Sequence, residues 1–179
     1  LGDARKTTKQ LETLLKTIEQ IIHQETGEIN QIINAFKARN EKPPRFDRSR
    51  GGRRLARKAA SLNDSEKTQI ESRFFRYAYL WNLRGGTLCM LACASYSSNE
   101  YERIDRIMAR LREQFLKEKA ELEPSPFQMG LFEMFKKVTN FQNWTERKQA
   151  FRGFLELGRY PQSPLDHGIL HWVRFQVEN

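Results

Sequence analysis

The sequence predicts an all-α fold, a helical bundle of about six to seven helices with a long N-terminal helix. Two observations support this fold class. Apolar residues recur three and four positions apart along most of the 179-residue chain, which is the period of an amphipathic helix. No stretch alternates convincingly between apolar and polar residues, so we expect no sheet.

The long N-terminal helix is predicted from a heptad seam. Its apolar residues alternate four and three apart, and only Glu25 breaks the series. A seam of this length packs either inside its own bundle or against another protein subunit, and the sequence leaves both open. The seam consists of Leu11, Leu15, Ile18, Ile22, Ile29, Ile32 and Phe36.

A change of composition follows the seam. Residues 37–58 contain two adjacent prolines, two adjacent glycines and almost no apolar side chains, which is typical of a loop or linker. The segment holds ten basic and two acidic residues, a net charge of +8. Since the whole chain carries +9, the other 157 residues carry only +1. The basic character of the protein is therefore local.

Helical periodicity returns after residue 62. Asn63 and Glu66 have capping-box spacing, and an apolar stripe follows them. We expect Arg84-Gly85-Gly86 to interrupt this helix, because glycine disfavours helices. The apolar run 87–94 then predicts a short helix in the centre of the core. The stripe consists of Ile70, Phe74, Tyr77 and Trp81.

Four further helix signals complete the chain. Ser97 and Glu100 have the spacing of a second capping box, and Ser125-Pro126 predicts a cap followed by a first-turn proline. The next helix covers residues 143–157 and is closed by Gly158. The last begins at Ser163-Pro164. Three parts are expected: a long helix over 1–36, a basic loop or linker over 37–62, and a helical bundle over 63–179.

The basic segment has the ingredients of a phosphate clamp. Arginine side chains match phosphate oxygens bidentately, glycines let the main chain approach closely, and an aromatic ring stacks on an unpaired base. Alternatively, the segment binds an acidic protein surface or, without an apolar anchor, an anionic membrane, or it is simply a solvated loop. The residues expected to bind nucleic acid are Lys42, Arg45, Phe46, Arg48, Arg50, Arg53, Arg54, Arg57 and Lys58.

A second basic surface is predicted on the helix over residues 97–122. Arg103, Arg106 and Arg110 share one face of it, and Arg73 and Arg76 could add to that surface. Acidic residues are interspersed on the same helix, so a merely solvated face is the alternative.

Catalytic and metal chemistry are not indicated. The chain has no phosphate loop, nucleophile elbow or paired-carboxylate signature, so we expect no enzyme, no cofactor and no small-molecule substrate. Cys89 with Cys93, and His167 with His171, are each four apart, but this is not the spacing of common zinc modules, and we expect no metal. The cysteine usage favours a reducing compartment, the cytoplasm, and no apolar run is long enough for a membrane.

In size, helicity and local basicity the chain resembles the small helical subunits of CRISPR effector ribonucleoproteins, which hold nucleic-acid strands through their backbones. The resemblance covers architecture and no residue pattern. We expect a non-catalytic subunit of a nucleoprotein assembly that binds DNA or RNA with little sequence specificity. The alternative is an adaptor whose heptad helix pairs with another subunit and whose basic segment docks on an acidic protein surface.

Overall fold

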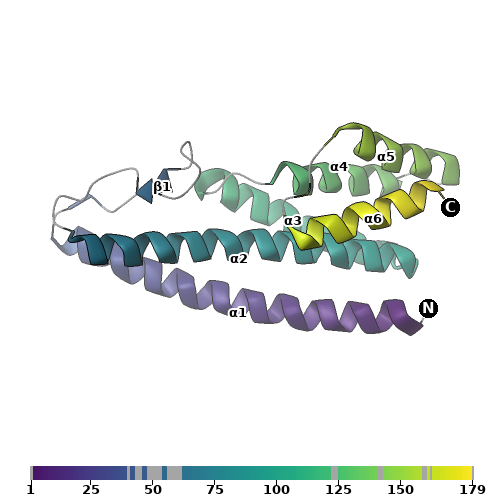
Figure 1. Ribbon diagram of the computed structural model, residues 1–179. Coiled ribbons are helices and arrows are strands. Elements are labelled where there is room, and N and C mark those ends of the chain that lie inside the picture. The colour runs from purple at the N-terminus through teal and green to yellow at the C-terminus, as the bar shows by residue number, and fades with distance from the viewer. Residues whose placement is uncertain are drawn as a thin grey trace. The chain divides into compact units, whose positions relative to one another are not determined.

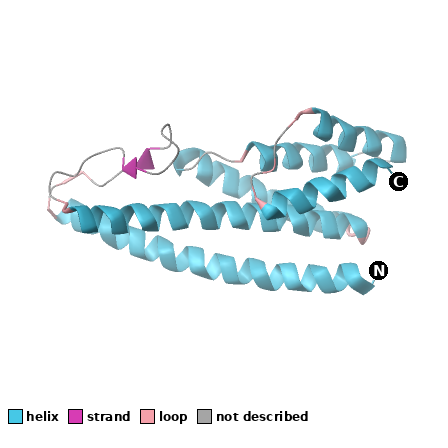
Figure 2. Cartoon of the chain, in the orientation of Figure 1, coloured by secondary structure: helices cyan, strands magenta, loops and turns pink. Residues whose placement is uncertain are grey.

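The computed structural model describes residues 2–39, 41–42, 46–47, 54–55, 62–121, 125–140, 143–158, 161 and 163–178. The all-α prediction is confirmed (Figures 1 and 2). None of the helices in these ranges is long and apolar enough to cross a membrane. The helices are α1 (Gly2–Ala38), α2 (Asp64–Ser97), α3 (Tyr101–Glu121), α4 (Pro126–Asn140), α5 (Trp144–Glu156) and α6 (Pro164–Glu178).

The expectation of no sheet is wrong at one place. Strands β1 (Phe46–Asp47) and β2 (Arg54–Leu55) form an antiparallel pair, with Phe46 opposite Leu55 and Asp47 opposite Arg54. Both strands lie inside the predicted loop. A strand of two residues is too short to show alternation in the sequence, which explains why the pattern did not reveal it.

The chain forms two compact units. The first comprises residues 1–16 and 82–179, and the second comprises residues 17–81. Helices α1 and α2 each contribute residues to both units. The predicted boundaries at residues 36 and 62 both fall within the second unit.

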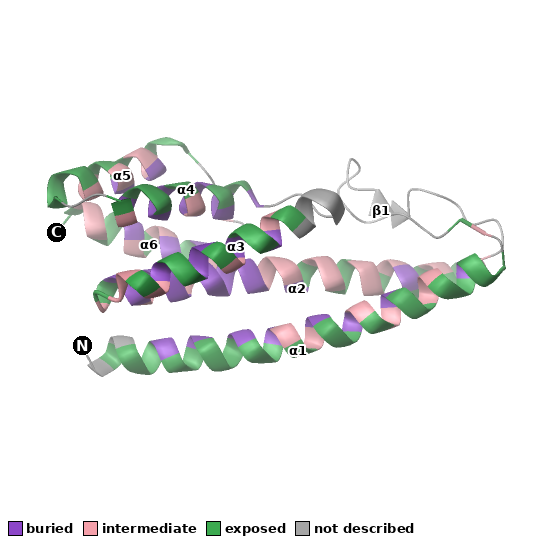
Figure 3. Ribbon diagram, turned by 180° about the vertical axis from the view of Figure 1, so that it is seen from behind, coloured by how far each residue is buried: buried purple, intermediate pink, exposed green. Residues whose placement is uncertain are grey.

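The core of the first unit is built around the second half of α2. Residues 84–93 of this helix are buried on nearly every side (Figure 3), which confirms the central position predicted for the run 87–94. Helix α3 packs against α4, α4 against α5, and α5 against α6. Tyr96 lies among three aromatic rings, and its edge-to-face contacts with Tyr101, Phe151 and Trp172 have centroid distances of 5.7, 5.5 and 5.6 Å.

The predicted interruption at Arg84-Gly85-Gly86 is wrong, because α2 is one continuous helix of 34 residues. Gly85 packs so closely that a Cβ atom there would lie 2.1 Å from Oε1 of Gln128. The surrounding polar groups are themselves paired: Arg84 donates to Gln114 at 2.9 Å, and Gln128 donates to the Asn82 carbonyl at 3.0 Å. The glycines therefore serve close packing rather than a turn.

Most predicted helix ends are confirmed. Asn63 accepts from the Glu66 backbone at 2.9 Å, and the Glu66 side chain accepts from the Asn63 backbone at 3.0 Å, which completes the capping box. Gly158 closes α5 with a φ of +58°. The Ser97–Glu100 box is wrong: the Ser97 hydroxyl donates to the Cys93 carbonyl at 3.1 Å, and the Glu100 side chain binds Arg103. Ser97 thus belongs to the end of α2.

In the second unit, residues 17–38 of α1 lie beside residues 64–81 of α2 (Figure 1). Across the whole seam, Ile32 is half-buried and the other six predicted residues are buried. Glu25, the polar residue of the series, is also buried, with 5 % of its side chain exposed. The chain's own residues thus cover the seam.

Candidate nucleic-acid interface

The basic segment is described in part. Lys42 is exposed, and the backbone of Phe46 lies in β1 and that of Arg54 in β2. Lys37 and Arg39, at the end of α1, are also exposed. The remaining predicted residues lie outside the described part of the chain: Arg45, Arg48, Arg50, Arg53, Arg57 and Lys58.

Six residues, 48–53, separate the paired residues Asp47 and Arg54 in the sequence. Those six residues include Arg48, Arg50 and Arg53 and two glycines. The antiparallel pairing therefore delimits a short basic stretch in the middle of the segment that joins α1 to α2.

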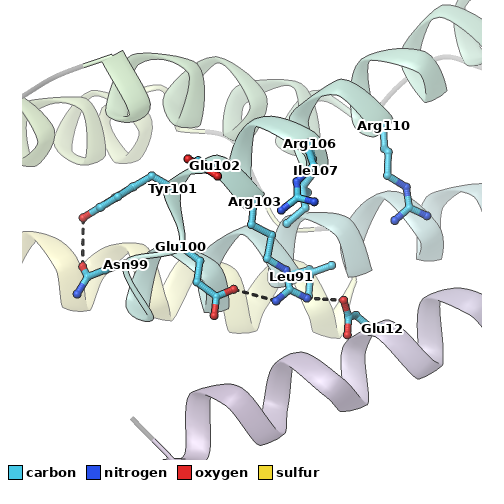
Figure 4. A pocket seen from close by; sticks show the side chains of 10 residues that line it. All are labelled: Glu12, Leu91, Asn99, Glu100, Tyr101, Glu102, Arg103, Arg106, Ile107 and Arg110. Carbon is cyan, nitrogen blue, oxygen red and sulfur yellow. Dashed lines mark hydrogen bonds and ion pairs between the residues drawn. The ribbon is translucent and has the colours of Figure 1, made fainter.

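The predicted arginines of α3 meet in a surface hollow of about 900 Å³ in the first unit (Figure 4). Its walls come from the start of α1, the end of α2 and the start of α3. Three of its side chains are basic and three are acidic. The lining residues are Glu12, Leu91, Asn99, Glu100, Tyr101, Glu102, Arg103, Arg106, Ile107 and Arg110.

Ion pairs neutralise the first of these arginines. Arg103 lies between Glu100, at 2.8 Å, and Glu12 of α1 (Figure 4), and only 22 % of its side chain is exposed. Arg106 is exposed and forms no ion pair with another described residue, whereas Arg110 is half-buried and interacts within the chain. Since the lining charges balance, the hollow itself does not attract an anion strongly.

Arg73 and Arg76 are committed to other partners. Both bind the buried Glu25, at 3.3 and 3.2 Å, and Arg73 also binds Glu28 at 2.9 Å. The heptad pattern does not reveal these ion pairs, although Glu25 stands out in it as the polar residue of the seam. The exposure of Phe75 and Tyr79 was not predicted either, because the predicted apolar stripe consists of neighbouring aromatic residues.

The cysteines and histidines do not converge. Cys89 and Cys93 are buried in α2, while His167 and His171 are exposed on α6. Burial raises the pKa of the Cys89 thiol, Asp166 raises it further, and burial likewise raises the pKa of Cys93. Both thiols therefore stay protonated at neutral pH. Within the described ranges, no three His, Cys, Asp or Glu side chains are grouped so that they could hold a metal.

No protein-family model, curated protein or solved structure matches this chain.

Proposed function

We propose that the protein binds the phosphate backbone of nucleic acid through residues 37–58, with little sequence specificity and without catalysing a reaction. The observation that carries this proposal is the charge distribution, since these 22 residues hold +8 of a total charge of +9. Seven of the ten basic residues are arginine, which binds phosphate bidentately. Backbone contacts position a protein without reading bases.

The salt dependence of binding tests the proposal. Each phosphate neutralised by a basic side chain releases counterions, so about six contacts predict a log-affinity versus log-salt slope of about −5 on duplex DNA and about −4 on a single strand. Replacing Arg48, Arg50, Arg53 and Arg54 by alanine should flatten the slope by roughly three to four units. Circular dichroism should show unchanged helicity.

A matched variant controls for total charge. Lys136, Lys137, Arg152 and Arg174 are exposed on α4, α5 and α6, and replacing these four by alanine changes the net charge equally. We expect the slope of this control to change by less than about one unit. A wild-type slope in the Arg48 quadruple variant, or an equal loss in both variants, would refute the assignment to residues 37–58.

A further inference from the structure

The outer side of α2 in the second unit carries two exposed aromatic rings. Phe75 is 55 % exposed and Tyr79 is 59 % exposed, while Ile70 and Leu80 of the same helix are buried. Residues four apart lie on one face of a helix, about 6 Å apart along its axis. The two rings therefore stand side by side, one helical turn apart, on the side away from the buried seam.

The surface around these rings is polar, and its charged side chains are paired within the chain, so it adds little attraction or repulsion of its own to the basic segment. Thr68 and Ser72, on the preceding turns, are exposed and uncharged. Arg76 flanks the rings, with 62 % of its side chain exposed and its Nε held by Glu25 at 3.2 Å. Glu71 is half-buried and engaged in an interaction within the chain. Arg76 thus offers a guanidinium group whose position is fixed by a buried carboxylate.

The exposed rings are too small for a stable protein interface. A fully buried aromatic side chain covers about 150–250 Å², so two rings exposed by slightly more than half offer roughly 200–250 Å². A stable protein complex needs about 800 Å² from each partner. Stacking on a planar base, in contrast, needs only one ring for each base.

The basic segment belongs to the same unit as the rings, residues 17–81. Phe75 lies eleven residues beyond Asp64, where α2 begins, or about 17 Å along the helix. A strand bound at the end of the basic segment can therefore reach the rings within a few nucleotides. Site sizes of about 4–16 nucleotides are usual when a basic groove and stacking rings act together.

We infer that Phe75 and Tyr79 form a stacking platform for the unpaired bases of a single-stranded nucleic acid whose phosphates are held by residues 37–58. This inference rests on the proposed function and adds the class of ligand. A duplex keeps its bases stacked on one another and has none to offer the rings, so the platform gives single strands an advantage. Because every base has a π-face, the platform is tolerant of sequence.

Binding of a 12-nucleotide single strand and of the matching duplex, measured by fluorescence anisotropy at one salt concentration, tests the inference. The variant Phe75→Ala with Tyr79→Ala should lose at least about 30-fold in affinity for the single strand. Its duplex affinity should stay within about twofold, and its salt slope should not change. A 2-aminopurine base in the strand should be quenched by the wild type and not by this variant.

Two further variants identify the role of the rings. Phe75→Tyr with Tyr79→Phe keeps both rings and should bind the single strand as the wild type does, whereas leucine at both positions should bind as weakly as alanine. The control replaces Trp144 and Phe175, which are 45 % and 57 % exposed in the first unit, by alanine and should bind normally. Equal losses in this control and in the Phe75/Tyr79 variant would overturn the platform.

The binding measurements distinguish an error in the platform inference from an error in the proposed function. Single-strand affinity that is unchanged in the Phe75/Tyr79 alanine variant, with a steep salt slope retained, refutes the platform alone. If that variant also loses a self-association seen by sedimentation velocity, the rings are a contact between copies of the chain. A wild-type protein that binds neither nucleic acid refutes both proposals.

Discussion

Glu25 shows how a polar residue is accommodated in an apolar seam. Its side chain is 5 % exposed, but its two partners, Arg73 and Arg76, are 39 % and 62 % exposed. The carboxylate has therefore been removed from water, while both arginine side chains remain in contact with it. A shift of α1 along α2 would bury the carboxylate without its arginines, so the cluster favours a single register.

Because of this difference in burial, mutating the arginines and mutating the glutamate should have different effects on stability. Replacing Arg73 and Arg76 by alanine leaves a buried carboxylate unpaired and should lower the free energy of unfolding by about 3 kcal/mol. Glu25→Leu returns two exposed arginines to water and completes the apolar seam, so it should change stability by less than about 1 kcal/mol or raise it. Urea denaturation measures both.

Glu28→Ala is the control for the arginine variant, because it removes only the exposed ion pair with Arg73 and should cost less than about 1 kcal/mol. A larger loss from Glu25→Leu than from the double arginine variant would contradict this account of the cluster.

At the scale of one element, α2 shows how tertiary packing overrides local propensity. Two adjacent glycines inside a helix disfavour it by about 1 kcal/mol each, yet α2 passes through Gly85 and Gly86 without a break. Gln128 is 1 % exposed and donates to the Asn82 carbonyl at 3.0 Å, and Gln114 is equally buried. These amides occupy the space beside Gly85 that a side chain would need.

Gly85→Ala should consequently destabilise the protein by about 2 kcal/mol or more, because the new Cβ would lie 2.1 Å from Gln128 and 2.8 Å from Gln114. The matched control is Gly27→Ala in α1, where nothing lies within 4 Å of the added atom. That change should stabilise the protein by about 0.5–1 kcal/mol. Thermal denaturation of both variants checks the contrast, and a stabilising Gly85→Ala would show that the amides can move aside.

Helix α2 also shows which features could be predicted from the sequence. The capping box of Asn63 and Glu66 was predicted correctly because its partners are three residues apart. The continuity of α2 and the pairing of Arg103 with Glu12 depend on residues 30 or more positions away, and periodicity does not reveal such contacts. The apolar face of the seam was predictable, while the identity of the helix covering it was not. The exposure of Phe75 likewise depends on which neighbours pack against α2.

At the scale of the whole molecule, the two units have unequal cores. Among the described residues, the connected core of the first unit contains 21 buried apolar side chains. In the second unit six apolar side chains are buried: Ile18, Ile22, Ile29, Phe36, Ile70 and Leu80. Since the burial of apolar surface is the main favourable term in folding, we expect the second unit to be less stable than the first. The second unit also contains the basic segment and the proposed platform.

Native-state hydrogen exchange should therefore detect opening of the second unit below the free energy of global unfolding. Peptides from residues 17–36 and 64–81 should exchange at lower denaturant than peptides from residues 88–111 and 127–138. Saturation with a single strand should slow exchange in the former set alone, because a ligand at about one hundred times its Kd stabilises the form it binds by about 2.7 kcal/mol. Ile22→Asp should make residues 17–36 and 64–81 exchange at a lower denaturant concentration. The control Leu14→Asp, at a side chain already 40 % exposed, should leave their exchange unchanged. Equal exchange of all four peptides in the wild type would mean that the chain unfolds as one cooperative body despite the unequal cores.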